Sequence, residues 1–295
     1  MSGNRLSIET MSGQGSNLCA GAPAKPFLRW AGGKNWLIKY LPELIRRDFR
    51  TYHEPFLGGG SIFFHLNPQN AYLSDANKEL IDTYLGVRDE VEKVIATIIS
   101  WPINEEQYYA VRAMNFDSPE EKAARFIYLN RTSFNGIYRV NRQGQYNVPW
   151  GKKDSYKFDY ARIRNASYAL QNVDIRCQSF EKSLDNISAG DLVFLDPPYT
   201  VSHNNNGFIE YNKKLFALED QRALRAYIDS LKRLGAFFIL TNAAHSTIKD
   251  IFKDIGTIYE LKRHCGLGGK NAQRANIGEY IFTNIPGITL EELNE

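Results

Sequence analysis

The stretch VFLDPPYT, residues 193–200, joins a strongly apolar run to an acid, two prolines and an aromatic residue. The run at 192–195 is short and proline follows it, so it predicts a strand buried on both faces of a parallel sheet. Asp196 then lies at the carboxyl end of that strand, the edge where open α/β sheets bind their ligands. An ordinary turn is the alternative, because Asp-Pro-Pro also favours turns.

The composition is that of a globular protein of one large domain or two smaller ones, since the 295 residues are 43% hydrophobic and 23% charged. The net charge of +3 is unevenly distributed. Residues 131–164 hold eight Lys or Arg against two Asp, together with seven aromatic residues. This mixture suits phosphates and bases, although a charged face exposed to solvent has the same composition.

Several kinds of site and location are not indicated by the sequence. Three cysteines without CxxC spacing favour neither disulfides nor zinc, and the five histidines form no HExxH motif, so no metal site is expected. No apolar stretch reaches membrane-spanning length and no signal-peptide core is present, which favours the cytoplasm and argues against a membrane partner. Residues 1–24 are Ser/Gly-rich and lack aromatic residues, so we expect a disordered extension.

The order of the expected elements is that of an interrupted α/β domain. Strand and helix patterns alternate after residue 25, lapse over 101–164 into helices and a hairpin around 142–144, and then resume. We therefore expect one α/β domain formed by 25–100 and 165–288, with 101–164 inserted. Strands are expected at 51–56, 71–75, 174–177, 191–196, 236–240, 257–262 and 279–284, and the clearest helices at 36–44, 76–99 and 218–235.

A glycine-rich stretch, EPFLGGGS (54–61), directly follows the first expected strand. Glycines such as Gly58 and Gly60 let backbone N–H groups approach a ligand where side chains would clash. Asp75, at the end of the next strand, is placed to bind ribose hydroxyls, although Ser74 or Asp75 could instead cap the following helix. Together the two features suggest an adenosine-containing cofactor.

The residues DPPY (196–199) suit chemistry on a planar amino group. The Asp196 carboxylate and the Pro197 carbonyl can accept the two amino hydrogens and draw the nitrogen toward a tetrahedral geometry. Tyr199 can stack on the base and hold it for in-line attack on a methyl donor. A sulfonium donor has a neutral leaving group, so this reaction requires no metal.

Six stretches resemble a known family and occur in the family's own order. They are FLRWAGGK (27–34), EPFLGGGS (54–61), LSDANKELI (73–81), RTSFNGIYRVN (131–141), QYNVPWG (145–151) and DPPY (196–199). On these motifs the chain resembles the Dam-type DNA adenine methyltransferases, the α group of amino-methyltransferases, over residues 25–285. The segment TVSHNNNGFIEY (200–211) departs from the Ser/Thr-rich stretch of the family, so the resemblance does not cover a loop that closes over the base.

The resemblance implies an α/β fold with a Rossmann-like, S-adenosyl-L-methionine-dependent methyltransferase sheet. It also implies methyl transfer to N6 of adenine in double-stranded DNA. Lys34 would pair with the cofactor carboxylate, Trp30 would offer a ring face to the sulfonium, and Asp75 would bind the ribose. By motif position, the cofactor-binding residues would be Trp30, Lys34, Phe56, Gly58, Gly60, Asp75 and Asp196.

By the same resemblance, the insertion would be a target-recognition domain of helices and a hairpin. The target adenine would be flipped out of the duplex, at a cost of about a few kcal/mol. Ile137, expected at the hairpin tip, would be the wedge, and Arg139 could span O6 and N7 of a guanine. The residues expected to contact DNA are Phe134, Asn135, Ile137, Arg139, Pro149, Lys152 and Lys153. Family members with this FNG-[LI]-YRVN and NVP pattern act on GATC, which is the expected target.

Other interpretations stay open. The same acid and aromatic residues would serve amino-methylation of cytosine or of a base in RNA, and a non-catalytic DNA-binding relic is a third possibility. The basic stretch at 265–278 is expected near DNA, with a plain surface loop as the alternative. Double-stranded DNA is the expected partner of a monomeric protein, and a cognate restriction endonuclease acting on the same site is left open.

Overall fold

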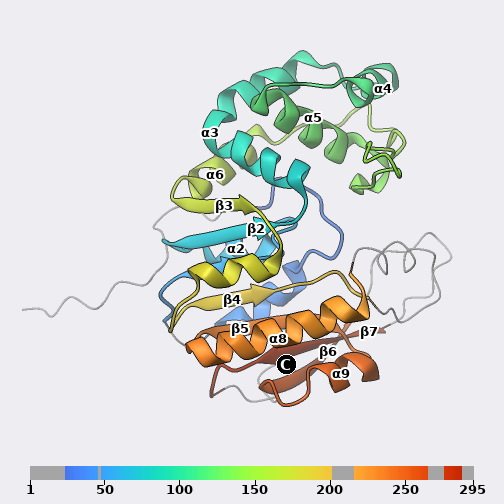
Figure 1. Ribbon diagram of the computed structural model, residues 1–295. Helices are drawn as coiled ribbons and strands as arrows, with labels where there is room; N and C mark the ends of the chain where they lie inside the picture. Colours follow the sequence, from blue (N-terminus) through green and yellow to red (C-terminus); the bar gives the residue numbers. More distant parts are fainter. Residues whose placement is uncertain (1–23, 46–47, 201–215, 265–275, 288–295) are drawn as a thin grey trace, which may run out of the picture.

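A seven-stranded sheet forms the centre of the computed structural model, which describes residues 24–45, 48–200, 216–264 and 276–287 (Figure 1). Residues 1–23 of the expected disordered extension (1–24), the segment 201–211 after DPPY, and most of the stretch at 265–278 lie outside the described residues. Within the described ranges, no helix is both long and apolar enough to cross a membrane.

The sheet has the doubly wound order β3-β2-β1-β4-β5-β7-β6. Its strands are β1 Tyr52–Glu54, β2 Ala71–Asp75, β3 Val173–Cys177, β4 Leu192–Leu195, β5 Phe237–Ala243, β6 Thr257–His264 and β7 Asn276–Thr283. β7 runs antiparallel to β5 and β6, whereas the other neighbouring pairs are parallel. The chain order reverses between β1 and β4, and a ligand crevice is expected beyond the carboxyl ends of strands at such a point. The expected α/β, Rossmann-like sheet is confirmed.

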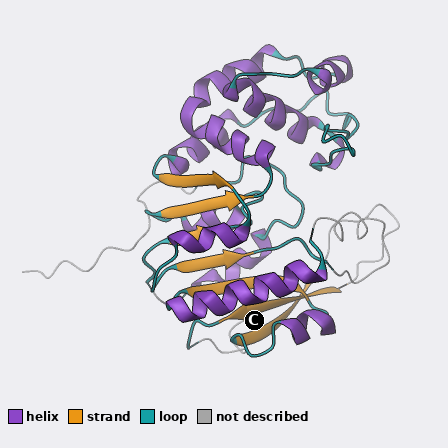
Figure 2. Ribbon diagram, viewed as in Figure 1, coloured by secondary structure: helices purple, strands orange, loops and turns teal. Residues whose placement is uncertain are grey.

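Helices cover both faces of this sheet (Figure 2). The helices of the described residues are η1 Asn35–Tyr40, α1 Leu41–Leu44, α2 Ser61–Leu66, α3 Lys78–Ser100, α4 Glu105–Ala113, α5 Pro119–Thr132, η2 Phe134–Gly136, α6 Tyr160–Leu170, η3 Phe180–Asn186, α8 Leu218–Leu234 and α9 Ser246–Ile251, of which α4 and η2 lie in the inserted segment away from the sheet. One apolar core joins η1, α1, α2, α3, α5 and α6 to the sheet, and a second core joins η3, α8 and α9 to its other face.

The expectation that β4 is buried on both faces is confirmed. Leu192 and Phe194 belong to the first core, whereas Val193 and Leu195 belong to the second. Successive side chains of a strand point to opposite faces, so each face of β4 contributes two apolar side chains to a core. Asp196 follows directly, at the carboxyl end of the strand.

The inserted segment has an apolar cluster of its own. The cluster consists of Tyr108, Val111, Tyr128, Leu129, Tyr146, Val148 and Trp150. α5 also packs against α3, so the insertion continues the first core of the sheet (Figure 1). The boundary expected at residue 164 falls inside α6, and the division at 101–164 stays a prediction.

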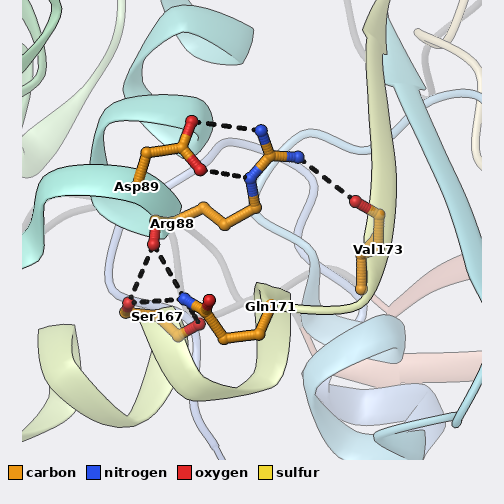
Figure 3. Close-up of polar contacts among 5 residues, drawn as sticks. All are labelled: Arg88, Asp89, Ser167, Gln171 and Val173. Atoms are coloured by element: carbon orange, nitrogen blue, oxygen red, sulfur yellow. Dashed lines mark hydrogen bonds and ion pairs between the residues drawn. The ribbon is translucent and has the colours of Figure 1, made fainter.

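The helix α3 is fixed to the sheet by Arg88 (Figure 3). The Arg88 guanidinium donates to the Asp89 carboxylate at 2.7 and 3.1 Å and to the Val173 carbonyl at 3.3 Å. From α6, the Ser167 hydroxyl and the Gln171 amide donate to the Arg88 carbonyl at 3.3 and 2.8 Å. These contacts fix α3 to β3 and to the C-terminal end of α6.

The expected hairpin forms as an irregular one. Described residues between 134 and 159 form no regular strand, and Val140 and Tyr146 make an isolated antiparallel bridge. The reason is local, because the Asn141 carboxamide oxygen accepts the N–H groups of Gln143 and Gln145 at 2.9 and 3.0 Å, and so closes the turn with a side chain. The tip therefore lies at 141–144, and the placement of Ile137 at the tip was wrong.

Candidate active site

Asp196 is held at the carboxyl end of β4 by two side chains. Its Oδ1 lies 2.8 Å from Lys34 Nζ and accepts a hydrogen bond from the Thr241 hydroxyl at 2.8 Å. Lys34 comes from the loop before η1, is only 3% exposed, and also donates to the Gly32 carbonyl at 2.7 Å. Burial raises the pKa of Asp196 above its usual range, and the Lys34 ammonium and the Thr241 hydroxyl oppose that rise.

Tyr199 is fixed at its ring face and at its hydroxyl. Lys34 Nζ lies 4.9 Å from the centre of the Tyr199 ring, within the range of a cation–π contact. The Tyr199 hydroxyl donates to Glu279 Oε2 at 2.7 Å. Glu279 is fully buried on β7, opposite Ala243 of β5. The DPPY residues are thus part of a network that joins three strands and the loop before η1, which an ordinary surface turn would not be.

Asp75 organises the glycine loop rather than capping a helix. Its Oδ2 accepts the Gly58 N–H at 3.0 Å and its Oδ1 accepts the Asn77 N–H at 2.9 Å. The N-cap of α3 is Asn77, whose side chain accepts from Leu80 N, so neither Ser74 nor Asp75 has that role. Burial raises the pKa of Asp75, and these backbone donors oppose the rise.

The indole of Trp30 lies between the glycine loop and the insertion. A Cβ on Gly58, which has φ +48°, would lie 2.7 Å from Cδ1 of Trp30, so only glycine fits. The Trp30 ring also stacks on two residues of the insertion, Tyr138 at 5.4 Å and Phe126 at 6.4 Å between ring centres. The loop before η1, which carries Trp30 and Lys34, therefore lies next to Gly58, the first glycine of EPFLGGGS.

Phe56 and Gly60, the remaining two residues of the expected cofactor site, lie on the glycine loop. Phe56 stacks on Phe180 at 5.3 Å, just beyond β3, and meets Phe216 edge to face at 5.8 Å. Gly60 has φ +65°, and a Cβ there would lie 3.1 Å from both Phe64 and the Tyr84 hydroxyl. The glycine loop is thus closely packed against α2 and α3, which carry Phe64 and Tyr84.

A buried acid beside these residues escaped the sequence interpretation. Glu54 ends β1 and is 3% exposed, and its Oε2 accepts the Tyr52 hydroxyl at 2.8 Å and the Phe63 N–H at 3.2 Å. Burial raises the pKa of Glu54 to about 8, against the opposing Tyr52 hydroxyl, and the nearby Asp196 and Asp75 add to the rise. The signal was available, because Glu54 follows a buried strand just as Asp75 and Asp196 do.

Four of the residues expected to contact DNA, namely Phe134, Asn135, Ile137 and Pro149, lie in or next to η2. Phe134 is 54% exposed, and its N–H donates to the carbonyl of the exposed Pro149 at 2.9 Å. Asn135 is exposed in a left-handed conformation with φ +56°. Ile137 is half-buried, and its carbonyl accepts the Tyr146 hydroxyl at 2.9 Å. Phe134, Asn135 and Pro149 thus share one exposed area, and Ile137 follows at its margin.

The basic residues expected to contact DNA are engaged to different degrees. The exposed Arg139 donates to the Asn147 side chain at 2.8 Å and to its carbonyl at 3.2 Å. Lys152 is exposed with φ +54°, whereas Lys153 is half-buried and donates to the Arg131 carbonyl at 2.8 Å. Burial, together with the charges of Arg29 and Arg131, lowers the pKa of Lys153 to about 8.

Comparison with known proteins gives one family. The model for D12 class N6 adenine-specific DNA methyltransferases matches residues 30–265. The type II methyltransferase M1.LlaDCHI of Lactococcus lactis subsp. cremoris is 35% identical, over 88% of this chain and 95% of that protein. The type II methyltransferase M.MjaIII of Methanocaldococcus jannaschii is 34% identical, over 74% and 84%. The DNA adenine methylase of Salmonella typhi is 25% identical, over 90% and 96%.

Proposed function

Because this chain belongs to the D12 class of N6 adenine-specific DNA methyltransferases, we propose that it uses S-adenosyl-L-methionine and acts on an adenine turned out of duplex DNA. Family membership confirms the resemblance to Dam-type enzymes and makes the chain an adenine-specific DNA methyltransferase. The observation that carries the proposal is the position of Asp196, held at the carboxyl end of β4 beside Lys34 and Tyr199.

The arrangement of Asp196 suits the amino group of adenine. Both Lys34 and Thr241 contact Oδ1, which leaves Oδ2 to accept one amino hydrogen. The carbonyl of the buried Pro197 is proposed to accept the other, so that the nitrogen lone pair turns toward the methyl donor. Tyr199 would hold the base by stacking, with its ring already fixed by Lys34 and by its hydroxyl contact. When bound, S-adenosyl-L-methionine supplies a methyl group on a sulfonium.

The residues present fit that donor. Asp75 uses one lone pair of each oxygen for a backbone N–H, and further lone pairs can accept ribose hydroxyls. Lys34 uses two of its three ammonium hydrogens on Asp196 and Gly32, so the third can meet the donor's carboxylate. Trp30 would offer its ring to the sulfonium.

Sequencing of modified bases in DNA from cells that express the chain tests this function. We expect N6-methyladenine within GATC, and its loss in the Asp196→Ala variant. Methylated cytosine, or methylated RNA with unmodified DNA, would replace the proposal with one of the alternative amino-methyltransferase functions. Because two relatives are named type II methyltransferases, we extend the proposal to protection from an endonuclease of the same specificity. Digestion of DNA from expressing cells by a GATC-specific nuclease checks that extension.

Two variants should distinguish residues that recognise the target sequence from residues that only bind the DNA backbone. Arg139→Ala should lower the ratio of methylation at GATC to that at a singly altered site by about 5- to 150-fold, since a bidentate guanine contact contributes about 1–3 kcal/mol. Lys152→Ala combined with Lys153→Ala should slow methylation of both duplexes and leave their ratio unchanged, because phosphate contacts carry no sequence information. Initial rates on both duplexes at one salt concentration give the ratios. Full discrimination by Arg139→Ala at every position would remove this residue as the reader.

Tyr199 and Glu279 should act as one unit. Tyr199→Phe and Glu279→Gln should each lower the single-turnover rate by about tenfold, equivalent to about 1.4 kcal/mol, because each loosens the ring that holds the base. The double variant should be slower than the parent by clearly less than the product of the two single effects, since both substitutions remove the same hydrogen bond. Effects that multiply in the double variant would contradict this role.

A further inference from the structure

Asn130 connects the segment before η1 that carries Arg29 and Trp30, here called the loop of Trp30, to the turn η2. Its side chain pairs with the backbone of Arg29 in both directions, since Oδ1 accepts the Arg29 N–H at 2.8 Å and Nδ2 donates to the Arg29 carbonyl at 2.8 Å. Nδ2 also lies 3.4 Å from the Gly136 carbonyl. Asn130 is fully buried on α5, where an amide without these partners would cost about 1–3 kcal/mol. One side chain therefore fixes Arg29 and Gly136 relative to each other.

Direct packing reinforces this connection. Gly136 has φ +65°, and a Cβ built on it would collide with the side chain of Arg29. The turn η2 thus lies against the residue that precedes Trp30. Phe134 and Asn135, the exposed residues of that turn, can hardly move without disturbing the loop.

Tyr138 makes a second connection. Its ring stacks on Trp30 at 5.4 Å and packs on Phe126 at 5.3 Å, and its hydroxyl donates to Glu79 Oε2 at 2.8 Å. Glu79 lies in the first turn of α3, the helix that begins just after Asp75. Tyr138 therefore contacts both the loop of Trp30 and the helix start next to Asp75.

We propose that Asn130 and Tyr138 are positioning residues that couple binding of the methyl donor to recognition of DNA. The inference rests on the proposed function in one respect, namely that Trp30 and Asp75 contact the donor. A donor that orders the loop of Trp30 and the start of α3 also orders η2 through these two side chains. The cost of ordering is then met by whichever ligand binds first, and the second ligand binds more tightly.

Binding measurements on the full chain test this coupling. The affinity for a GATC duplex is measured with and without saturating sinefungin, an analogue in which an amine-bearing carbon replaces the sulfonium. The parent should bind DNA at least about fivefold more tightly with sinefungin present, at the lower end of typical coupling. Tyr138→Phe should reduce this factor at least threefold, and Asn130→Ala should bring it close to one. The same factors must appear when sinefungin is titrated with and without DNA, because coupling is reciprocal.

Tyr128→Phe is the matched control. It also removes one tyrosine hydroxyl from the insertion, but this hydroxyl donates to the Pro102 carbonyl at 2.7 Å and not to η2, to the residues around Trp30 or to α3. Its coupling factor should equal that of the parent. If Asn130→Ala does not fold, Tyr138→Phe alone decides.

Two results would overturn the inference. One is a parent without coupling, and the other is a Tyr138→Phe variant whose coupling factor equals that of the parent. In either case the proposed function stands if the parent still binds sinefungin and methylates DNA. A parent that binds no sinefungin would overturn the inference and the proposed donor together.

Discussion

Asp196→Ala should abolish methyl transfer and leave the affinity for DNA within about threefold of the parent. The carboxylate is proposed to accept an amino hydrogen only as the nitrogen becomes tetrahedral, and loss of one such positioned group costs about 10²- to 10³-fold in rate. The single-turnover rate on a GATC duplex and the duplex affinity are the two measurements. Transfer within tenfold of the parent would refute the assignment.

Two further variants guard this prediction against a trivial loss of folding. Asp196→Ala leaves the buried Lys34 ammonium without its partner, and breaking a buried pair costs about 3–5 kcal/mol of stability. Asp196→Asn keeps the volume and a carbonyl oxygen, and it should remain folded and inactive. Asp191→Asn alters a buried acid at the other end of β4, where the side chain binds His53 and Arg50. That control should lower thermal stability and leave the rate of the folded enzyme unchanged.

The parts of the site that lie at strand ends were predictable from sequence. Asp75 and Asp196 each follow an apolar run of strand length, and parallel strands bring their carboxyl ends to one edge of a sheet. Lys34 was recognised from its motif, because no local rule pairs it with Asp196 across 162 residues. Local patterns place a residue on an element, but they do not say which distant side chain faces it.

The missed residues show the same limit. Glu279 interrupts the apolar pattern of β7, and Thr241 interrupts that of β5. The interruptions predict that both are buried polar side chains, but they do not predict which side chains these two bind. Asn130 lies in a helix whose sequence gives no sign that its amide pairs with the backbone of Arg29. The alternation of apolar and polar residues on either side of 142–144 predicts a hairpin of two strands. In the structure, side-chain hydrogen bonds of Asn141 and Arg139 replace part of the backbone pairing between those strands.

Lys34→Met and Asp75→Asn should each weaken donor binding by about 10- to 150-fold, since hydrogen bonds to charged groups contribute about 1.5–3 kcal/mol. Methionine keeps the buried stem of Lys34 and removes the ammonium that is proposed to meet the donor's carboxylate. Asparagine keeps the size of Asp75 and one oxygen for a backbone N–H, and removes the charge that is proposed to accept the ribose hydroxyls. Calorimetry of S-adenosyl-L-methionine binding to the full chain without DNA gives the affinities.

Lys39→Met is the matched control, because it removes the same charge from η1, where the Lys39 ammonium packs over its neighbour Tyr40 at 4.5 Å from the ring centre. It should leave the donor affinity within twofold of the parent. Lys34 differs from Lys39 in being buried against Asp196, so its loss should also raise the pKa of Asp196 and slow transfer at saturating donor. Asp75 is not bonded to Asp196, so Asp75→Asn should weaken binding and largely spare that saturated rate. Unchanged donor affinity in both Lys34→Met and Asp75→Asn would place the donor elsewhere on the protein.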